Sequence, residues 1–106
     1  MLEKTVEDHL VRRVAETGGQ QRKVTWLGHK GAPDRLVGWP AYEPADSALD
    51  RERPARHVLV EMKKPKGPGA EAHQQREHKK LRAIGFEVRV IHTKEQVDEF
   101  ILEMTS

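Results

Sequence analysis

Two carboxylates in this sequence have the types and spacing that phosphodiester hydrolysis requires. Glu61 lies near the end of the run HVLVEMK at 57–63, and Asp34 follows a Gly-Ala-Pro segment upstream. Such hydrolysis needs a divalent ion that offsets phosphate charge and activates a water nucleophile. Mg²⁺ takes oxygen ligands and usually binds only one or two protein carboxylates. Asp34 and Glu61 can supply these carboxylates, and the backbone carbonyl of Met62 is the candidate for a third ligand.

Lys63 can serve such a site without touching the ion. A protonated ammonium group cannot ligate a metal, and neighbouring carboxylates favour the protonated form. We therefore expect Lys63 to hold the attacking water or to stabilise negative charge in the transition state, rather than to act as a general base. Taken alone, Glu61 and Lys63 would be interpreted as an ordinary charged pair on a strand surface. The interpretation as a catalytic site therefore depends on the elements around them.

The run from 58 to 63 is typical of a β-strand, because aliphatic residues fill it and charge arrives at its end. Side chains alternate between the two faces of a strand. The residues at 58, 60 and 62 therefore share one face, and Glu61 and Lys63 share the other with Leu59. Residues 34–39 predict a second strand, in which Asp34 and Leu36 face the same way.

The other elements follow from hydrophobic periodicity and turn signals. We expect a helix over 3–16, strands over 23–27, 34–39 and 58–63, a helix over 72–84, a strand over 86–92 and a helix after 93. Gln74 is predicted to face the sheet, on an inward line that continues through 77 or 78, 81 and 84. Thr93 and Gln96 predict a capping box. The loop over 40–56 is long, and it could form a hairpin tip, a substrate clamp or an interface arm.

A further carboxylate falls on the apolar face of the first helix. Glu7 projects between Leu10 and Val11 at 3.6 residues per turn. A carboxylate in an apolar arc needs a partner or a function. One interpretation makes Glu7 an additional member of the acidic site, and the other makes it a rim glutamate paired with an arginine.

The composition of the chain limits the classes of protein to which it can belong. The chain has 106 residues, 36% hydrophobic and 34% charged, with a net charge of +2, which suggests one domain over 1–106 with a small core. The absence of Cys excludes disulfides and thiolate metal sites. No apolar run reaches membrane length and no signal-peptide pattern is present, so we expect a cytoplasmic protein without membrane contact. Residues 51–66 hold six Lys or Arg and two Glu, which suits a polyanion or a solvated loop.

Motifs along nearly the whole chain together resemble the VRR-NUC family, the virus-type replication and repair nucleases of the PD-(D/E)xK superfamily. They are Glu7, Lys23, GAPD at 31–34, EMK at 61–63, Gln74 and LRAIGFEV at 81–88. The resemblance implies a restriction-endonuclease-like α/β fold with a mixed sheet flanked by helices, plus an extra C-terminal helix. Ala32 and Met62 replace larger or more usual aliphatic residues, and neither contributes a side chain to the chemistry.

The resemblance also implies roles for individual residues. Asp34 and Glu61 match the metal ligands of a Mg²⁺- or Mn²⁺-dependent nuclease, and Lys63 matches its catalytic lysine. Gln74 matches the glutamine on the following helix, and Glu7 matches the glutamate on the first helix. Because the match spans the chain, the sequence looks like a stand-alone, phage-type member.

Stand-alone members look like junction resolvases, so we expect a structure-specific endonuclease for Holliday junctions or other branched DNA. Two symmetric cuts need two sites, which a two-fold homodimer supplies. The alternative function is a nuclease-fold DNA-binding module without turnover. The candidate DNA contacts are Lys23, Lys30, Lys64 and Lys66.

Histidines and tryptophans follow no metal or stacking pattern that we recognise. The histidines at 29, 57, 73 and 78 are expected on the surface, with His29 as a weak candidate for a phosphate contact. Trp26 and Trp39 are expected in the core or at a dimer contact rather than as base-stacking platforms.

Overall fold

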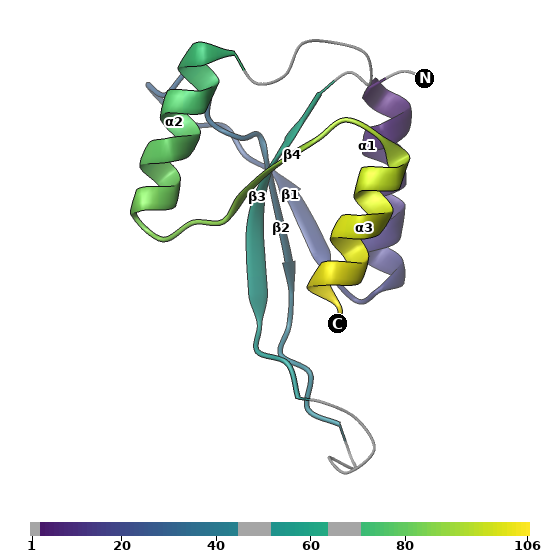
Figure 1. Cartoon of the computed structure of the whole chain (residues 1–106). Coiled ribbons are helices and arrows are strands. Elements are labelled where there is room, and N and C mark those ends of the chain that lie inside the picture. The colour runs from purple at the N-terminus through teal and green to yellow at the C-terminus, as the bar shows by residue number, and fades with distance from the viewer. Residues whose placement is uncertain (1–2, 45–51, 64–70) are drawn as a thin grey trace.

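Helices cover both faces of a mixed four-stranded sheet (Figure 1). The computed structural model describes residues 3–44, 52–63 and 71–106. The elements are α1 (Glu3–Glu16), β1 (Gln20–Lys23), β2 (Arg35–Trp39), β3 (Arg56–Met62), α2 (Ala72–Ala83), β4 (Val88–Ile91) and α3 (Lys94–Met104). This confirms the predicted α/β class and element order, with α3 as the extra C-terminal helix. No helix in the described ranges is long and apolar enough to cross a membrane.

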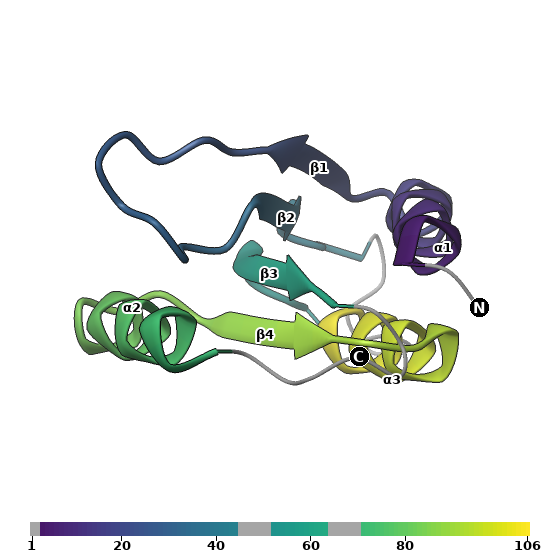
Figure 2. The same ribbon diagram turned by 90° about the horizontal axis from the view of Figure 1, so that it is seen from above.

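The sheet has the strand order β1-β2-β3-β4. The first two pairings, β1 with β2 and β2 with β3, are antiparallel, whereas β3 and β4 are parallel. Parallel neighbours need a crossover connection, and α2 lies within it. Seen from above, α1 and α3 lie on one side of the sheet and α2 lies on the other (Figure 2).

The strand alternation predicted for β3 is confirmed by its two packing faces. Val58, Val60 and Met62 belong to the main core, together with residues of α1 and α3. On the opposite face, Leu59 packs with Leu81 of α2 and with a valine of β4 in a smaller cluster. The position of Glu61, two residues after Leu59, therefore lies on the α2 side of the sheet.

The two tryptophans pack inside the fold, as the core interpretation expects. Trp39 is only 8% exposed, and its ring meets Phe100 edge-on at 5.9 Å between centroids. Its indole N–H donates to the Thr17 hydroxyl at 2.9 Å. Trp26 is half-buried against the α2-side cluster.

The first strand lies three residues earlier than predicted. Its four residues are polar, and they pair with β2 through their backbone at the edge of the sheet. The more apolar segment that we expected to form the strand leaves the sheet after Val24. Trp26 instead turns its indole N–H to the Pro33 carbonyl at 2.7 Å, and Leu27 is 89% exposed. Pairing across the sheet, and not local β-propensity, decides where this strand lies.

The ends of two other elements also differ from expectation. The inward line of α2 stops at Leu81, because the helix ends at Ala83 and Ile84 is 73% exposed. The last strand is shorter than predicted and begins only at Val88. At the start of α3, Thr93 accepts the Gln96 N–H as predicted, but Gln96 accepts from His92 N–H rather than from Thr93.

The described ends of the 40–56 loop form a hairpin that extends β2 and β3 away from the body (Figure 1). Tyr42 and Arg53 exchange backbone hydrogen bonds of 2.8 and 2.9 Å. The Arg53 guanidinium lies 4.8 Å from the Tyr42 ring centroid and also donates to the Thr105 carbonyl. These ends therefore pair as a hairpin, while 45–51 lies outside the described residues, and the roles of substrate clamp and interface arm stay predictions.

Candidate active site

The β2–β3 ladder brings Asp34 and Glu61 onto neighbouring strands. The antiparallel register pairs Arg35 with Val60, so Asp34 and Glu61 are the next opposed positions. Arg35 turns toward α1, where it donates to Glu7, and Asp34 therefore projects to the α2 side. Directly opposed residues on one face of such a pair have Cβ atoms about 4.5–5.5 Å apart. The sheet thus joins two carboxylates that are far apart in the sequence.

Gly31 explains why the loop before Asp34 can pass close to α2. It has a φ of 90°, and a Cβ there would lie 2.7 Å from His73 Cδ2 and 3.2 Å from Gln74 Cα. Both the backbone conformation and this close approach favour glycine. The loop is thereby held against the first turn of α2.

A second set of contacts fixes the same loop from the β1 side. Val24 N–H donates to the Asp34 carbonyl at 2.8 Å, and Trp26 donates to the Pro33 carbonyl. These backbone contacts leave the Asp34 side chain exposed. Its carboxylate is thus available to an ion or a substrate.

Glu61 is buried, with 8% of its surface exposed, and it faces a histidine of α2. The Nε2 of His78 lies 3.8 Å from Glu61 Oε1. His78 itself is 1% exposed, so its predicted surface position was wrong. Burial is the main cause that lowers the pKa of His78, and the positive charges of Arg82 and Lys63 act in the same direction. The signal in the sequence was its helical spacing from Gln74 and Leu81, at i+4 and i+7 on one face.

Lys63 follows β3 directly and lies in the same neighbourhood. Its backbone N–H donates to the Ile91 carbonyl at 2.9 Å, which continues the parallel ladder. Its charge acts on His78, and the strand alternation places its side chain on the face of Glu61. Glu61, Lys63 and His78 therefore gather where β3 meets α2.

Two other predicted site residues have different immediate partners. Gln74 Oε1 accepts the Glu71 N–H at 2.9 Å, so the glutamine caps the start of α2. Glu7 accepts a hydrogen bond from Arg35 and lies 4.0 Å from Lys23 Nζ, on the α1 side of the sheet. The interpretation of Glu7 as a glutamate paired with an arginine matches this contact.

The candidate DNA-binding lysines are only partly described. Lys23 is 72% exposed in its side chain, and Lys30 is also exposed. Lys64 and Lys66 lie outside the described residues. In the basic stretch 51–66, Arg56 lies 3.6 Å from a carboxylate oxygen of Glu87, which partly balances its charge.

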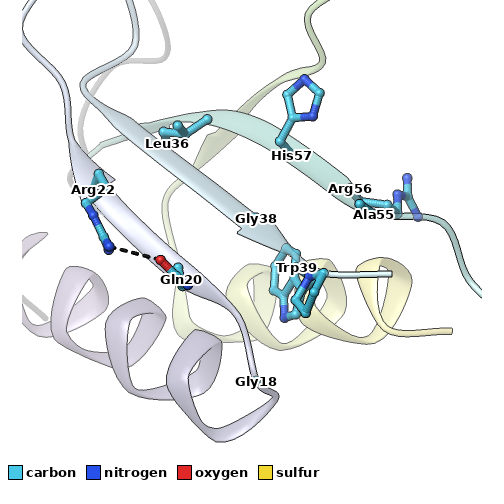
Figure 3. A pocket seen from close by; sticks show the side chains of 10 residues that line it. Gly18, Gln20, Arg22, Leu36, Gly38, Trp39, Ala55, Arg56 and His57 are labelled. Atoms are coloured by element: carbon cyan, nitrogen blue, oxygen red, sulfur yellow. Dashed lines mark hydrogen bonds between the residues drawn. The ribbon is translucent and has the colours of Figure 1, made fainter. Parts of the chain in front are cut away.

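An open groove of about 430 Å³ lies on the same face of the sheet (Figure 3). Leu36, Gly38 and His57 line it, and Arg22 donates to Gln20 at 2.9 Å beside it. The register pairs Gly38 with His57, at the end of the β2–β3 ladder opposite to Asp34 and Glu61. The groove is therefore separate from the carboxylate pair.

The oxygen donors at the ladder end fit a hard cation. The described parts of the chain hold no group of three or more His, Cys, Asp or Glu side chains that could bind a metal ion. Mg²⁺ needs fewer protein ligands, because it keeps several waters and binds substrate phosphate. Asp34 and Glu61 supply two carboxylates, and the Met62 side chain lies in the core, so that only its backbone carbonyl can take part.

Comparisons with known proteins find two proteins that are similar to this chain over most of its length. No protein-family model matches the chain. It is 33% identical over 93 residues to "Putative nuclease p44" of Acyrthosiphon pisum secondary endosymbiont phage 1, across 88% of this chain and 85% of that protein. It also superposes on a solved structure described as "VRR_NUC domain" with a TM-score of 0.70 and 32% identity, across 94% of both chains.

Proposed function

Since this chain belongs to the VRR-NUC family of nucleases, we propose that it is a divalent-metal-dependent endonuclease for branched DNA. The observation that carries the proposal is the opposition of Asp34 and Glu61 across β2 and β3, with Lys63 on the same face. A nuclease that uses one Mg²⁺ or Mn²⁺ ion needs little more protein chemistry than this set provides.

Asp34, Glu61 and the Met62 carbonyl would hold the ion. When bound, the ion supplies Lewis acidity, which offsets phosphate charge and lowers the pKa of a coordinated water. The two carboxylates of this chain would hold the ion beside the scissile phosphate. Asp34 is exposed, and its position at the open end of the ladder suits a polymeric substrate.

Lys63 would act beside the carboxylates through its positive charge. Its ammonium group can hold the attacking water and stabilise negative charge that develops on the phosphate oxygens. Gln74 would support the site from the first turn of α2, where its side chain already caps the helix. Glu7 would act indirectly, because it holds Arg35 immediately after Asp34.

The proposal of a branched-DNA substrate depends on a two-fold symmetric arrangement of two active sites. The described residues of each chain offer one such carboxylate pair, whereas resolution of a four-way junction needs two matched cuts. A two-fold homodimer provides both, and such dimers are the commonest oligomers. The family membership favours this assignment over a DNA-binding module without turnover.

The direct test compares cleavage of a labelled four-way junction with cleavage of the matched linear duplex. We expect cleavage with Mg²⁺ or Mn²⁺, none with EDTA, none for Asp34→Asn or Glu61→Gln, and a preference for the junction. Calorimetric titration should show weaker metal binding in both variants. Light scattering at micromolar protein should give the mass of a dimer.

Different outcomes would remove different parts of the proposal. Junction binding without cleavage under any divalent ion would favour the binding module. A monomer that cuts linear duplex as fast as junctions would retain the nuclease and remove the resolvase assignment. Unchanged metal binding in both carboxylate variants would move the metal site elsewhere.

A further inference from the structure

We propose that His78 positions the carboxylate of Glu61 through a hydrogen bond from its Nε2, and so sets the affinity of the site for its divalent ion. The inference rests on the proposed metal role of Glu61. His78 would act as a positioning residue, because it acts through the carboxylate and not on the substrate. It would explain a buried polar side chain that the proposed chemistry does not otherwise use.

The position of His78 is an unusual one for an imidazole. Only two residues of α2 are buried, His78 and Leu81. Leu81 packs on Leu59 and Val88 as an aliphatic side chain should. A ring 1% exposed in the same interface loses its water, and burial of a polar group is unfavourable unless it gains a hydrogen bond. His78 therefore needs a polar partner on the sheet.

The unsatisfied atom of the ring is the one near Glu61. Within the described residues, His78 Nε2 is buried and makes no hydrogen bond. Glu61 Oε1 lies 3.8 Å from it, just beyond hydrogen-bonding distance. A small side-chain rotation would close this gap. Because buried polar groups in folded proteins almost always find a partner, a neutral ring with a proton on Nε2 would donate to this carboxylate.

The geometry of α2 against β3 makes the pairing specific. Along α2, His78 precedes Leu81 by three residues, which is a rise of about 4.5 Å. Along β3, Glu61 follows Leu59 on the same face by about 6.6 Å. The contact of Leu81 with Leu59 therefore sets His78 opposite Glu61. The close approach of Gly31 to the first turn of α2 further restricts movement of the helix.

A hydrogen-bonded carboxylate makes a better-defined ligand. Groups that orient metal ligands from behind typically change metal affinity about 10–100-fold when they are removed. His78 lies inside the α2 interface, 3.8 Å from Oε1 of Glu61. A hydrogen bond there would fix that oxygen and so restrict the orientations in which Glu61 can bind the ion.

The test uses calorimetric titration of Mn²⁺ into the full chain without DNA. His78→Leu keeps bulk and removes the donor, and we expect its Kd for Mn²⁺ to rise about 10–100-fold. His78→Gln places an amide N–H near the position of Nε2, and it should bind within a few-fold of the wild type. His78→Asn places its donor nearer to the position of Nδ1, and it should bind as weakly as the leucine variant.

Val97→Ala is the matched control, because it removes a buried side chain of α3 in the main core, on the other face of the sheet from α2 and Glu61. It should lower the Tm and leave the Kd for Mn²⁺ unchanged. If His78→Leu does not fold, the contrast between the glutamine and asparagine variants decides the question in its place.

The outcomes separate this inference from the proposed function. Wild-type Mn²⁺ affinity in His78→Leu, or equal affinity in the glutamine and asparagine variants, would overturn the role of His78 alone. A Kd in Val97→Ala that rises as much as in His78→Leu would assign the effect to general loosening of the fold. A wild-type chain that binds no Mn²⁺ would overturn both the metal site and its positioning residue.

Discussion

Glu7 of α1 accepts a hydrogen bond from the guanidinium of Arg35, the residue that directly follows Asp34. The Arg35 side chain is 5% exposed, and it also donates to the Gln21 side-chain oxygen. A buried guanidinium needs such acceptors, because an unpaired charge is costly away from water. The first helix is thereby tied to the strand that presents one of the proposed metal ligands.

Replacement of Glu7 should destabilise the fold and disturb the site indirectly. Glu7→Gln removes the negative partner of Arg35, and we expect a loss of about 1–3 kcal/mol in the free energy of unfolding. Urea denaturation measures this loss. Glu16→Gln on the same helix removes only an exposed partner of Arg12 and Arg13 and should have a much smaller effect. Equal stability of the two variants would argue against a structural role for the Glu7–Arg35 pair.

Removal of the Lys63 ammonium should slow cleavage without loss of the ion. Stabilisation of transition-state charge by one donor is often worth about 10²–10³ in rate, so Lys63→Ala should lose about that factor in kcat. Its Kd for Mn²⁺ should stay near that of the wild type. Steady-state cleavage of a junction, together with calorimetry, measures both quantities. Wild-type turnover in this variant would assign the chemistry to other residues.

Two glycines with positive φ offer a matched test of the loop before Asp34. Gly28 has a φ of 75°, and a Cβ added there would have open space within 4 Å. A Cβ added at Gly31 would lie only 2.7 Å from the side chain of His73. Gly28→Ala should cost only the backbone term of about 1–2 kcal/mol. Gly31→Ala should cost more and should also slow cleavage, because the loop must move away from α2. Equal stability and activity in the two variants would contradict this account of the loop.

The link between α1 and α3 should weaken in acid. The hydrogen bond with His9, 2.8 Å long, is the largest cause that lowers the pKa of Asp98, and Arg13 adds to it. A carboxyl group whose pKa is lower in the folded state stabilises the fold above its unfolded-state pKa of about 3.9. That stabilisation is lost as the pH falls through the folded-state pKa.

Thermal unfolding from pH 7 to pH 2 tests this expectation. Asp98→Asn should have a lower Tm than the wild type near neutral pH, and the two curves should converge at the acid end. Asp8 is an exposed α1 residue that makes no ion pair within the described residues, so Asp8→Asn is the control and should follow the wild type. A constant Tm difference between Asp98→Asn and the wild type at every pH would refute the linkage.

Short-range patterns determined much of the fold. The alternation of residues 58–63 assigned the two faces of β3 correctly, because strand geometry places successive side chains on opposite faces whatever surrounds them. The periodicity of α1 and the Thr93 side-chain cap of α3 were predicted correctly for the same local reason, whereas the return bond of Gln96 goes to His92. The common face of Glu61 and Lys63 needed only this alternation.

Contacts between distant parts of the chain decided the rest. The partner of Glu7 is Arg35, 28 residues away, and no local pattern selects one arginine among several. His78 was expected on the surface because it follows no metal-ligand spacing, although helical periodicity left position 77 or 78 on the inward line of α2. The packing of α2 on β3 selects His78 and buries it beside Glu61. The first strand likewise lies at the polar residues 20–23 and not at the predicted 23–27, because backbone pairing with β2 outweighs the side-chain preferences of residues 24–27.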